Sequence, residues 1–161
     1  MWLTKKARAK ATLKAQALLG EGAIQGLAFG ETGPNPTYTT WGLIGGAILI
    51  FAMTFAIFRV GIFVGGLIIF AIRYYVNPPR CIVIADRGVA LLKRGAWSVH
   101  PTELVAKLPH DITNNVVEDS GSRLQLNLGV ERVWVTKKEY AHLQLATRRL
   151  PQQPLPQQPS F

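Results

Sequence analysis

The residues in this chain that could do chemistry are few, and none stands in a catalytic or metal-binding spacing. The three histidines, His100, His110 and His142, have no second histidine or cysteine at the spacing that metal ligands require. The single cysteine, Cys81, lies in an apolar run, where a buried strand thiol is the expected role. The sequence contains no nucleophile elbow and no phosphate-binding glycine loop. It therefore predicts a protein without catalysis, metal or cofactor.

A second kind of chemistry is the binding of anions, because the chain is strongly basic. Its 18 lysines and arginines outnumber 9 acidic residues, which gives a formal net charge of +9. Such an excess is typical of nucleic-acid-binding proteins. Here the positive charges are divided between the N-terminal arm, the flanks of an apolar run and the C-terminal part. No recognition helix or aromatic-basic platform is evident, so we expect no nucleic-acid partner.

The apolar run constrains the architecture most strongly. Between Trp41 and Ile72 the single charged residue is Arg59. As one helix, residues 41–76 would be about 54 Å long, against about 30 Å for the hydrocarbon core of a bilayer. Two spans, 41–58 and 60–76, fit better, with a turn at 59–61 where Gly61 supplies backbone freedom. The sequence thus predicts a transmembrane helical hairpin. The alternative is a single tilted span with a second, interfacial helix.

The charges that flank this run predict its orientation. Both flanks are basic, with Lys5, Lys6, Arg8, Lys10 and Lys14 upstream and Arg73, Arg80, Arg87, Lys93 and Arg94 downstream. Basic flanks favour the cytoplasmic side of a membrane. We therefore expect a multi-pass protein of the cell (plasma) membrane with both termini cytoplasmic. The lone cysteine is consistent with a reducing compartment.

Four glycines could let the two helices pack closely. Gly42 and Gly46 form one pair, and Gly61 and Gly65 another, each at the small-residue spacing of close contacts between membrane helices. In an antiparallel hairpin that turns near residue 60, the two pairs lie at different depths. One pair could then serve the hairpin and the other a neighbouring subunit. The alternative is that glycine is simply common in membrane helices.

After the apolar run, the pattern changes to short strands. The residues Asn77, Pro78 and Pro79 end the second span. Short apolar runs between turn residues then predict strands at 81–85, 89–92, 97–99, 103–108, 115–118, 124–128 and 130–135. Thr136 and Glu139 have the spacing of a helix-opening capping box, and apolar residues follow at helical spacing to Leu150. We expect this helix to close over the sheet.

The chain therefore divides into five predicted parts. They are a basic cytoplasmic juxtamembrane arm (1–29), a linker (30–40), the transmembrane hairpin (41–76), a strand-rich cytoplasmic domain (80–150) and a Pro/Gln-rich tail (151–161). The predicted fold class is a membrane α-helical hairpin plus a small α+β, mostly-β domain. The tail repeats Pro-Gln-Gln-Pro. It is expected to be disordered or, alternatively, to dock as an extended segment in a partner's groove.

The strand-rich part resembles a known family. The run Cys-Ile-Val-Ile-Ala-Asp-Arg-Gly-Val-Ala-Leu-Leu (81–92), the repeated short hairpins and the capped C-terminal helix resemble bacterial pleckstrin-homology-like domains, many of which are attached to membrane helices. With Gly-Glu-Thr-Gly-Pro-Asn-Pro (30–36), the chain resembles uncharacterised actinobacterial membrane proteins that carry such a domain. The resemblance covers residues 30–150. It implies a bent sheet or barrel closed by a helix, and binding of lipid or protein without catalysis.

If the resemblance extends to anionic lipid headgroups, the basic residues near strand turns are the candidate binding residues. These are Arg87, Lys93, Arg94 and Lys107. The alternative is that they are ordinary solvated charges, because the first hairpin has no dense cluster of basic residues.

The sequence as a whole predicts a non-enzymatic, membrane-anchored binding or scaffolding module. Its expected partners are membrane lipids and a protein partner or a second copy of the chain. The alternative function is a small accessory subunit of a larger bacterial membrane protein complex.

Overall fold

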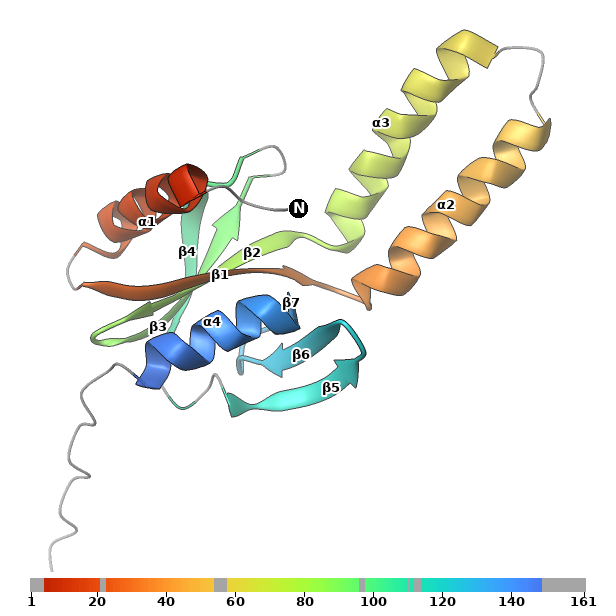
Figure 1. Ribbon diagram of the computed structural model, residues 1–161. Helices are drawn as coiled ribbons and strands as arrows, with labels where there is room; N and C mark the ends of the chain where they lie inside the picture. Colours follow the sequence, from red (N-terminus) through yellow and green to blue (C-terminus); the bar gives the residue numbers. More distant parts are fainter. Residues whose placement is uncertain are drawn as a thin grey trace, which may run out of the picture.

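The computed structural model describes residues 5–20, 23–53, 58–95, 98–109, 111 and 114–148, and gives the backbone alone for helical residues 49–53 and 58–64. Its elements are α1 (Lys5–Leu19), β1 (Ile24–Thr32), α2 (Pro36–Met53), α3 (Phe58–Val76), β2 (Pro79–Ala85), β3 (Gly88–Arg94), β4 (Pro101–Leu108), β5 (Val116–Ser120), β6 (Arg123–Asn127), β7 (Arg132–Thr136) and α4 (Lys137–Arg148). These strands form one antiparallel sheet in the order β4-β3-β2-β1-β7-β6-β5. In Figure 1, α1 and α4 lie against the sheet, and α2 and α3 project away from it.

Strand β1 is the centre of this sheet. It pairs with β2 along most of its length and with β7 at residues 30–32. It thereby joins two consecutive meanders, β2-β3-β4 and β5-β6-β7. The sequence pattern did not predict this strand, because its two glycines, Gly26 and Gly30, interrupt the alternation of apolar residues. Each glycine is explained by a close approach: Gly26 faces Ala146 of α4, and Gly30 faces Val133 and the backbone of Trp134.

The main hydrophobic core lies between the sheet and α4. Its largest fully buried members include Ile82, Leu91, Leu126 and Leu143. The predicted start of α4 is confirmed, because the N–H of Glu139 donates to Oγ1 of Thr136 at 3.2 Å. The other half of the predicted capping box differs. The carboxylate of Glu139 accepts the N–H of Phe29 on β1 and so joins α4 to the sheet.

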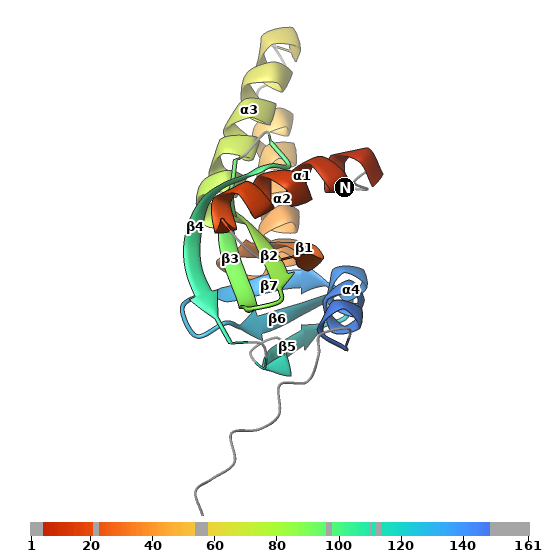
Figure 2. The same cartoon turned by 90° about the vertical axis from the view of Figure 1, so that its left-hand side faces the viewer.

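Helix α1 covers the other face of the sheet, across β1–β4 (Figure 2). Ala11 and Ala15, one helical turn apart, are fully buried, and their small side chains let the helix approach closely. With α4 beneath and α1 above, every residue of β2 is buried, including Cys81 at 0 % exposure. This explains why the sequence of β2 is a continuous apolar run, and it confirms the prediction of a buried strand thiol.

Most predicted strands are found in the sheet. The predictions at 81–85, 89–92 and 103–108 fall within β2, β3 and β4, and those at 115–118, 124–128 and 130–135 overlap β5, β6 and β7. The prediction at 97–99 is wrong for residues 98 and 99, which are not in a strand, while residue 97 lies outside the described residues. The tail at 151–161 also lies outside them.

The predicted transmembrane hairpin at 41–76 is wrong. Within the described residues, no helix is both long enough and apolar enough to cross a membrane. One reason is that α2 begins at Pro36, so its first turns consist of polar residues whose hydroxyls donate back to the backbone, as Thr39 and Thr40 do. Helix α3 includes both Arg59 and Arg73. The predicted turn at residues 59–61 lies inside α3.

The predicted location falls with the predicted spans. A multi-pass protein of the plasma membrane with both termini cytoplasmic requires helices that cross the bilayer, and the described residues contain none. The predicted fold class is corrected to a seven-stranded antiparallel sheet with α1 and α4 packed on it and α2 and α3 projecting from it, all within the described residues.

The close approach of β1 to α4 gives a stability prediction. In the variant Gly26→Ala the new Cβ overlaps that of Ala146, so we expect the free energy of unfolding to fall by about 1–3 kcal/mol. The control is Gly45→Ala in α2, where a Cβ meets nothing within 4 Å. Because alanine favours a helix over glycine, this control should be neutral or up to about 1 kcal/mol more stable. Urea unfolding followed by circular dichroism measures both. Equal stability of the two variants would contradict the packing.

Cys81 gives a prediction of pH dependence. Burial raises the pKa of its thiol from the ordinary 9.0 to about 12. Above pH 9 the unfolded chain therefore loses the proton that the folded chain keeps. This residue alone should then lower the free energy of unfolding by about 1.4 kcal/mol per pH unit. The loss should extend from pH 9 to about 12 and be absent below pH 9. In Cys81→Ala this part of the decline should vanish. Urea unfolding measures the free energy of both proteins. If it falls equally with pH in the parent chain and in Cys81→Ala, the prediction is wrong.

Candidate functional site

The foot of the helical hairpin, where α2 and α3 meet the sheet, is held to the sheet by hydrogen bonds. The buried amide of Asn77, after α3, donates to the carbonyls of Thr32 at 2.9 Å and Pro34 at 2.7 Å. Trp134 of β7 donates its indole N–H to the carbonyl of Gly33 at 3.1 Å. Gly33 has a φ of +95°, and a side chain there would overlap the backbone of Val76. These hydrogen bonds fix the segment that leads into α2 and the segment that leaves α3. The sheet therefore sets the direction in which the hairpin projects.

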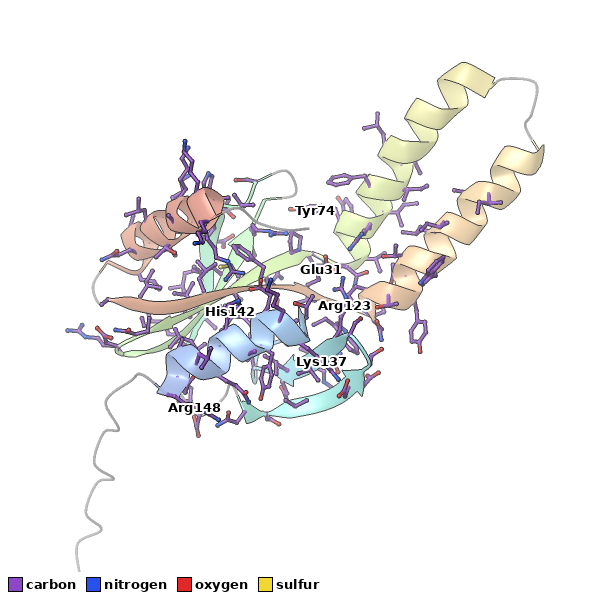
Figure 3. All side chains as sticks on the ribbon, in the orientation of Figure 1. Glu31, Tyr74, Arg123, Lys137, His142 and Arg148 are labelled. Carbon is purple, nitrogen blue, oxygen red and sulfur yellow. The ribbon has the colours of Figure 1, made fainter. Side chains whose placement is uncertain are left out.

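One carboxylate links the hairpin to both halves of the sheet. Glu31 on β1 accepts from Nη2 of Arg73 on α3 at 3.1 Å and from Nη1 of Arg123 on β6 at 3.3 Å. Figure 3 shows Glu31 and Arg123 close to the base of the hairpin, with Tyr74 of α3 nearby. All three charged side chains are partly buried, which reduces solvent screening of their attraction.

A second charged group surrounds the ring of Phe29. The guanidinium carbons of Arg8 and Arg94 lie 5.7 Å and 5.3 Å from the ring centroid, within the range of cation–π attraction. Arg8 also forms an ion pair with Glu139 and donates to the carbonyl of Leu27 at 3.0 Å. No ion pair is described for Arg94. Its buried Nε has no hydrogen-bond partner among the described residues, and burial lowers the pKa of this guanidinium.

These two charged groups border the same cleft, which has a volume of about 350 Å³. Its walls come from β1, the base of α3, β7, the first turn of α4 and the end of β3. Phe70 and Tyr74 of α3 line it together with Arg73, Arg94 and Arg123. A small molecule with both a negative and an apolar part would find complementary groups here. We therefore treat this cleft as the candidate site.

The four basic residues predicted from the sequence do not gather in one place. Arg94 borders the cleft, and its neighbour Lys93 forms an exposed ion pair with Glu103 at 2.8 Å. Arg87 is exposed in the turn at the other end of β3, roughly 20 Å away at the rise of an extended strand. Lys107 is exposed on β4. The predicted set therefore contributes one residue, Arg94, to the cleft.

The glycines predicted to pack the helices leave open faces. A Cβ at Gly42, Gly46 or Gly65 would have no heavy atom of a described residue within 4 Å. They therefore do not bring α2 and α3 into close contact with each other. Gly61 belongs to α3, and its surroundings lie outside the described part of the chain. Contact of these glycines with a second chain stays a prediction.

The sequence patterns did not indicate Glu31, Arg73 and Arg123 as site residues. A signal was present, because Glu31 is the single acidic residue between Glu21 and Asp86. An isolated acid just before an apolar run, with an arginine just after the run, could have suggested an ion pair across the hairpin. Arg123 had no such signal, since it is 92 positions from Glu31.

Comparison with known proteins adds no relative. The chain matches no protein-family model, no curated protein and no solved structure. The resemblance to pleckstrin-homology-like domains therefore stays a prediction.

The ion pairs of Glu31 with Arg73 and Arg123, called the Glu31 network, give a stability prediction. Replacing glutamate by glutamine should destabilise the protein more at position 31 than at position 103. Glu31→Gln leaves two partly buried arginines without their carboxylate, so we expect the free energy of unfolding to fall by about 1–3 kcal/mol. The control Glu103→Gln removes one exposed ion pair, which should change stability by no more than about 0.5 kcal/mol. Chemical unfolding measures both. If the two variants lose the same stability, the Glu31 network does not stabilise the foot of the hairpin.

Proposed function

We propose that this protein is a non-enzymatic binding or scaffolding module that contacts another protein chain through its helical hairpin. The observation that carries the proposal is the exposure of large apolar side chains along α2 and α3. Trp41 and Ile48 on α2 are 68 % and 63 % exposed, and Leu67 and Tyr75 on α3 are 60 % and 87 % exposed. Several large apolar side chains exposed along one pair of helices are typical of an interaction site.

The exposed residues follow the spacing of a helix–helix contact. On α3, Ile68, Ile72 and Tyr75 recur after four and three residues, and all are exposed. On α2, Trp41 and Ile48 are separated by seven residues, which places them on the same face. Such stripes normally pack against the stripe of another helix. Burial contributes about 25 cal/mol for each Å² of apolar surface, so covering both stripes would favour association strongly.

The partner that fits this surface is another apolar helical surface. Two antiparallel helices bury only the faces that they turn to each other. A second pair would complete a four-helix bundle and cover the remaining faces. A second copy of this chain supplies such a pair, and so does a helical hairpin of a different protein. The open faces at Gly42, Gly46 and Gly65 would let a partner helix approach closely.

In this proposal the sheet domain is the base from which the hairpin projects. Its successive hairpins and its capped C-terminal helix are the features on which the resemblance to bacterial pleckstrin-homology-like domains rests. We therefore keep that assignment as part of the proposal. Binding of anionic lipid headgroups stays a prediction from the sequence, because the four residues proposed for it do not form one patch.

A second candidate is an accessory subunit of a larger protein complex. The open glycine faces favour it, because they suit a permanent close contact more than a transient one. The two candidates share one surface and differ in whether a single partner stays bound. Purification in mild conditions followed by native mass spectrometry distinguishes them, since a subunit would copurify with its partner in a fixed ratio.

The proposal predicts that association depends on the hairpin. A photocrosslinking amino acid at Ile48 or Ile68 should form protein adducts in cells, and the same residue at Leu13 should not. Leu13 is the matched control, because it lies on α1, outside the hairpin, and is at least as exposed as Ile48 and Ile68. Ile48→Glu should weaken the captured contact at least about tenfold, since a charge would have to be buried. Leu13→Glu should leave it unchanged.

Two results would contradict the proposal. One is equal protein crosslinking from Leu13 and from the hairpin positions. The other is a hairpin that forms no protein adduct at any of its exposed apolar positions.

A further inference from the structure

The cleft at the foot of the hairpin has an unequal balance of charge. Of the described residues that border it, three are arginines, Arg73, Arg94 and Arg123, and two are glutamates, Glu31 and Glu139. Glu31 accepts from both Arg73 and Arg123, and Glu139 is paired with Arg8 from outside the cleft. Both carboxylates are thus already engaged. Arg94 is the arginine for which no carboxylate partner is described.

Arg94 carries a buried donor that no described residue satisfies. Its Nε has no hydrogen-bond partner among the described residues, although the ring of Phe29 lies against the guanidinium. Because the guanidinium borders the cleft, an anion there would pair with its charge and recover part of the free energy that burying an unpaired charge costs. Arginine suits this role because its planar fork binds the two oxygens of a carboxylate or phosphate together.

The rest of the cleft favours a ligand with an apolar part. Phe70 and Tyr74 of α3 border it, together with the ring of Phe29. The volume of about 350 Å³ is at the small end of ligand pockets.

We propose that this cleft binds a small organic anion, with its carboxylate or phosphate group against Arg94 and its flat apolar part beside Phe70 and Tyr74. The proposal stands independently of the partner proposed for the hairpin. It adds a consequence for that hairpin, because Phe70, Arg73 and Tyr74 all belong to α3. A bound ligand would contact both the sheet and the base of α3.

The test uses four probes on the full chain, followed by isothermal titration calorimetry. Phenyl phosphate and benzoate carry the two candidate head groups on a flat apolar ring. Inorganic phosphate lacks the ring, and benzyl alcohol lacks the charge. We expect phenyl phosphate or benzoate to bind with a Kd of about 1 mM or lower. The tighter of the two identifies the head group. Inorganic phosphate and benzyl alcohol should both bind more weakly.

Two variants show whether Arg94 is responsible. Arg94→Gln should weaken binding of the better probe at least about tenfold, because it removes the charge-assisted hydrogen bonds. Lys107→Gln is the control, since it removes one positive charge from an exposed site outside the cleft. It should bind like the parent chain. If Arg94→Gln fails to fold by circular dichroism, Arg94→Lys replaces it. That variant keeps the charge and should still bind several-fold more weakly, because lysine lacks the planar fork.

Three results would overturn the proposal. The first is no binding of phenyl phosphate or benzoate up to about 10 mM. The second is equal binding by the parent chain and the Arg94 variant. The third is inorganic phosphate binding as tightly as phenyl phosphate, which would refute the contact with the aromatic residues.

Discussion

Backbone pairing on both edges of β1 joins the two halves of the sheet, and the other elements depend on it. β1 pairs with β2 along one edge and with β7 at residues 30–32 along the other. Where the pairing with β7 stops, α4 continues the contact, since Glu139 accepts the N–H of Phe29 and Ala146 packs on Gly26. This arrangement satisfies backbone groups that would otherwise be buried without partners. It also gives α4 its place over the core.

The position of β1 explains where the charged groups meet. β1 leads directly into the hairpin, so Glu31 near its end lies beside Arg73 at the base of α3. β7 and β6 follow on the other side, which brings Arg123 to the same carboxylate. The cleft exists because the hairpin leaves the sheet at this point and does not cover the first turn of α4. Arg94, at the end of β3, completes its border.

The hairpin and the cleft therefore share one structural base. The hydrogen bonds of Asn77 and the ion pairs of Glu31 fix how α3 leaves the sheet. The exposed apolar stripes then extend in a direction that the sheet determines. A protein that bound the stripes and a small anion that bound the cleft would both contact α3 in the half of the helix nearest the sheet. This shared helix is the physical route by which one could affect the other.

The sequence by itself determined those strands and helix ends that depend only on residues close together in the chain. The apolar runs of β2 and β3, the alternation in β6, and the cap at Thr136 are local patterns, and each was read correctly. Local pattern failed for β1, whose glycines are explained only by Ala146 and Val133, far along the chain. It also failed for the apolar run at 41–72, where the turn predicted at residues 59–61 lies inside α3.

Only the tertiary structure decided which charges meet. Arg87, Lys93, Arg94 and Lys107 looked alike in the sequence, and the fold brings one of them, Arg94, to the cleft. The partners in the Glu31 network are 42 and 92 positions apart. No spacing rule reaches so far, because ion pairing depends on distance in space, and the order of the strands sets that distance. The chain thus encodes its elements locally, while its candidate site arises from the way β1 brings them together.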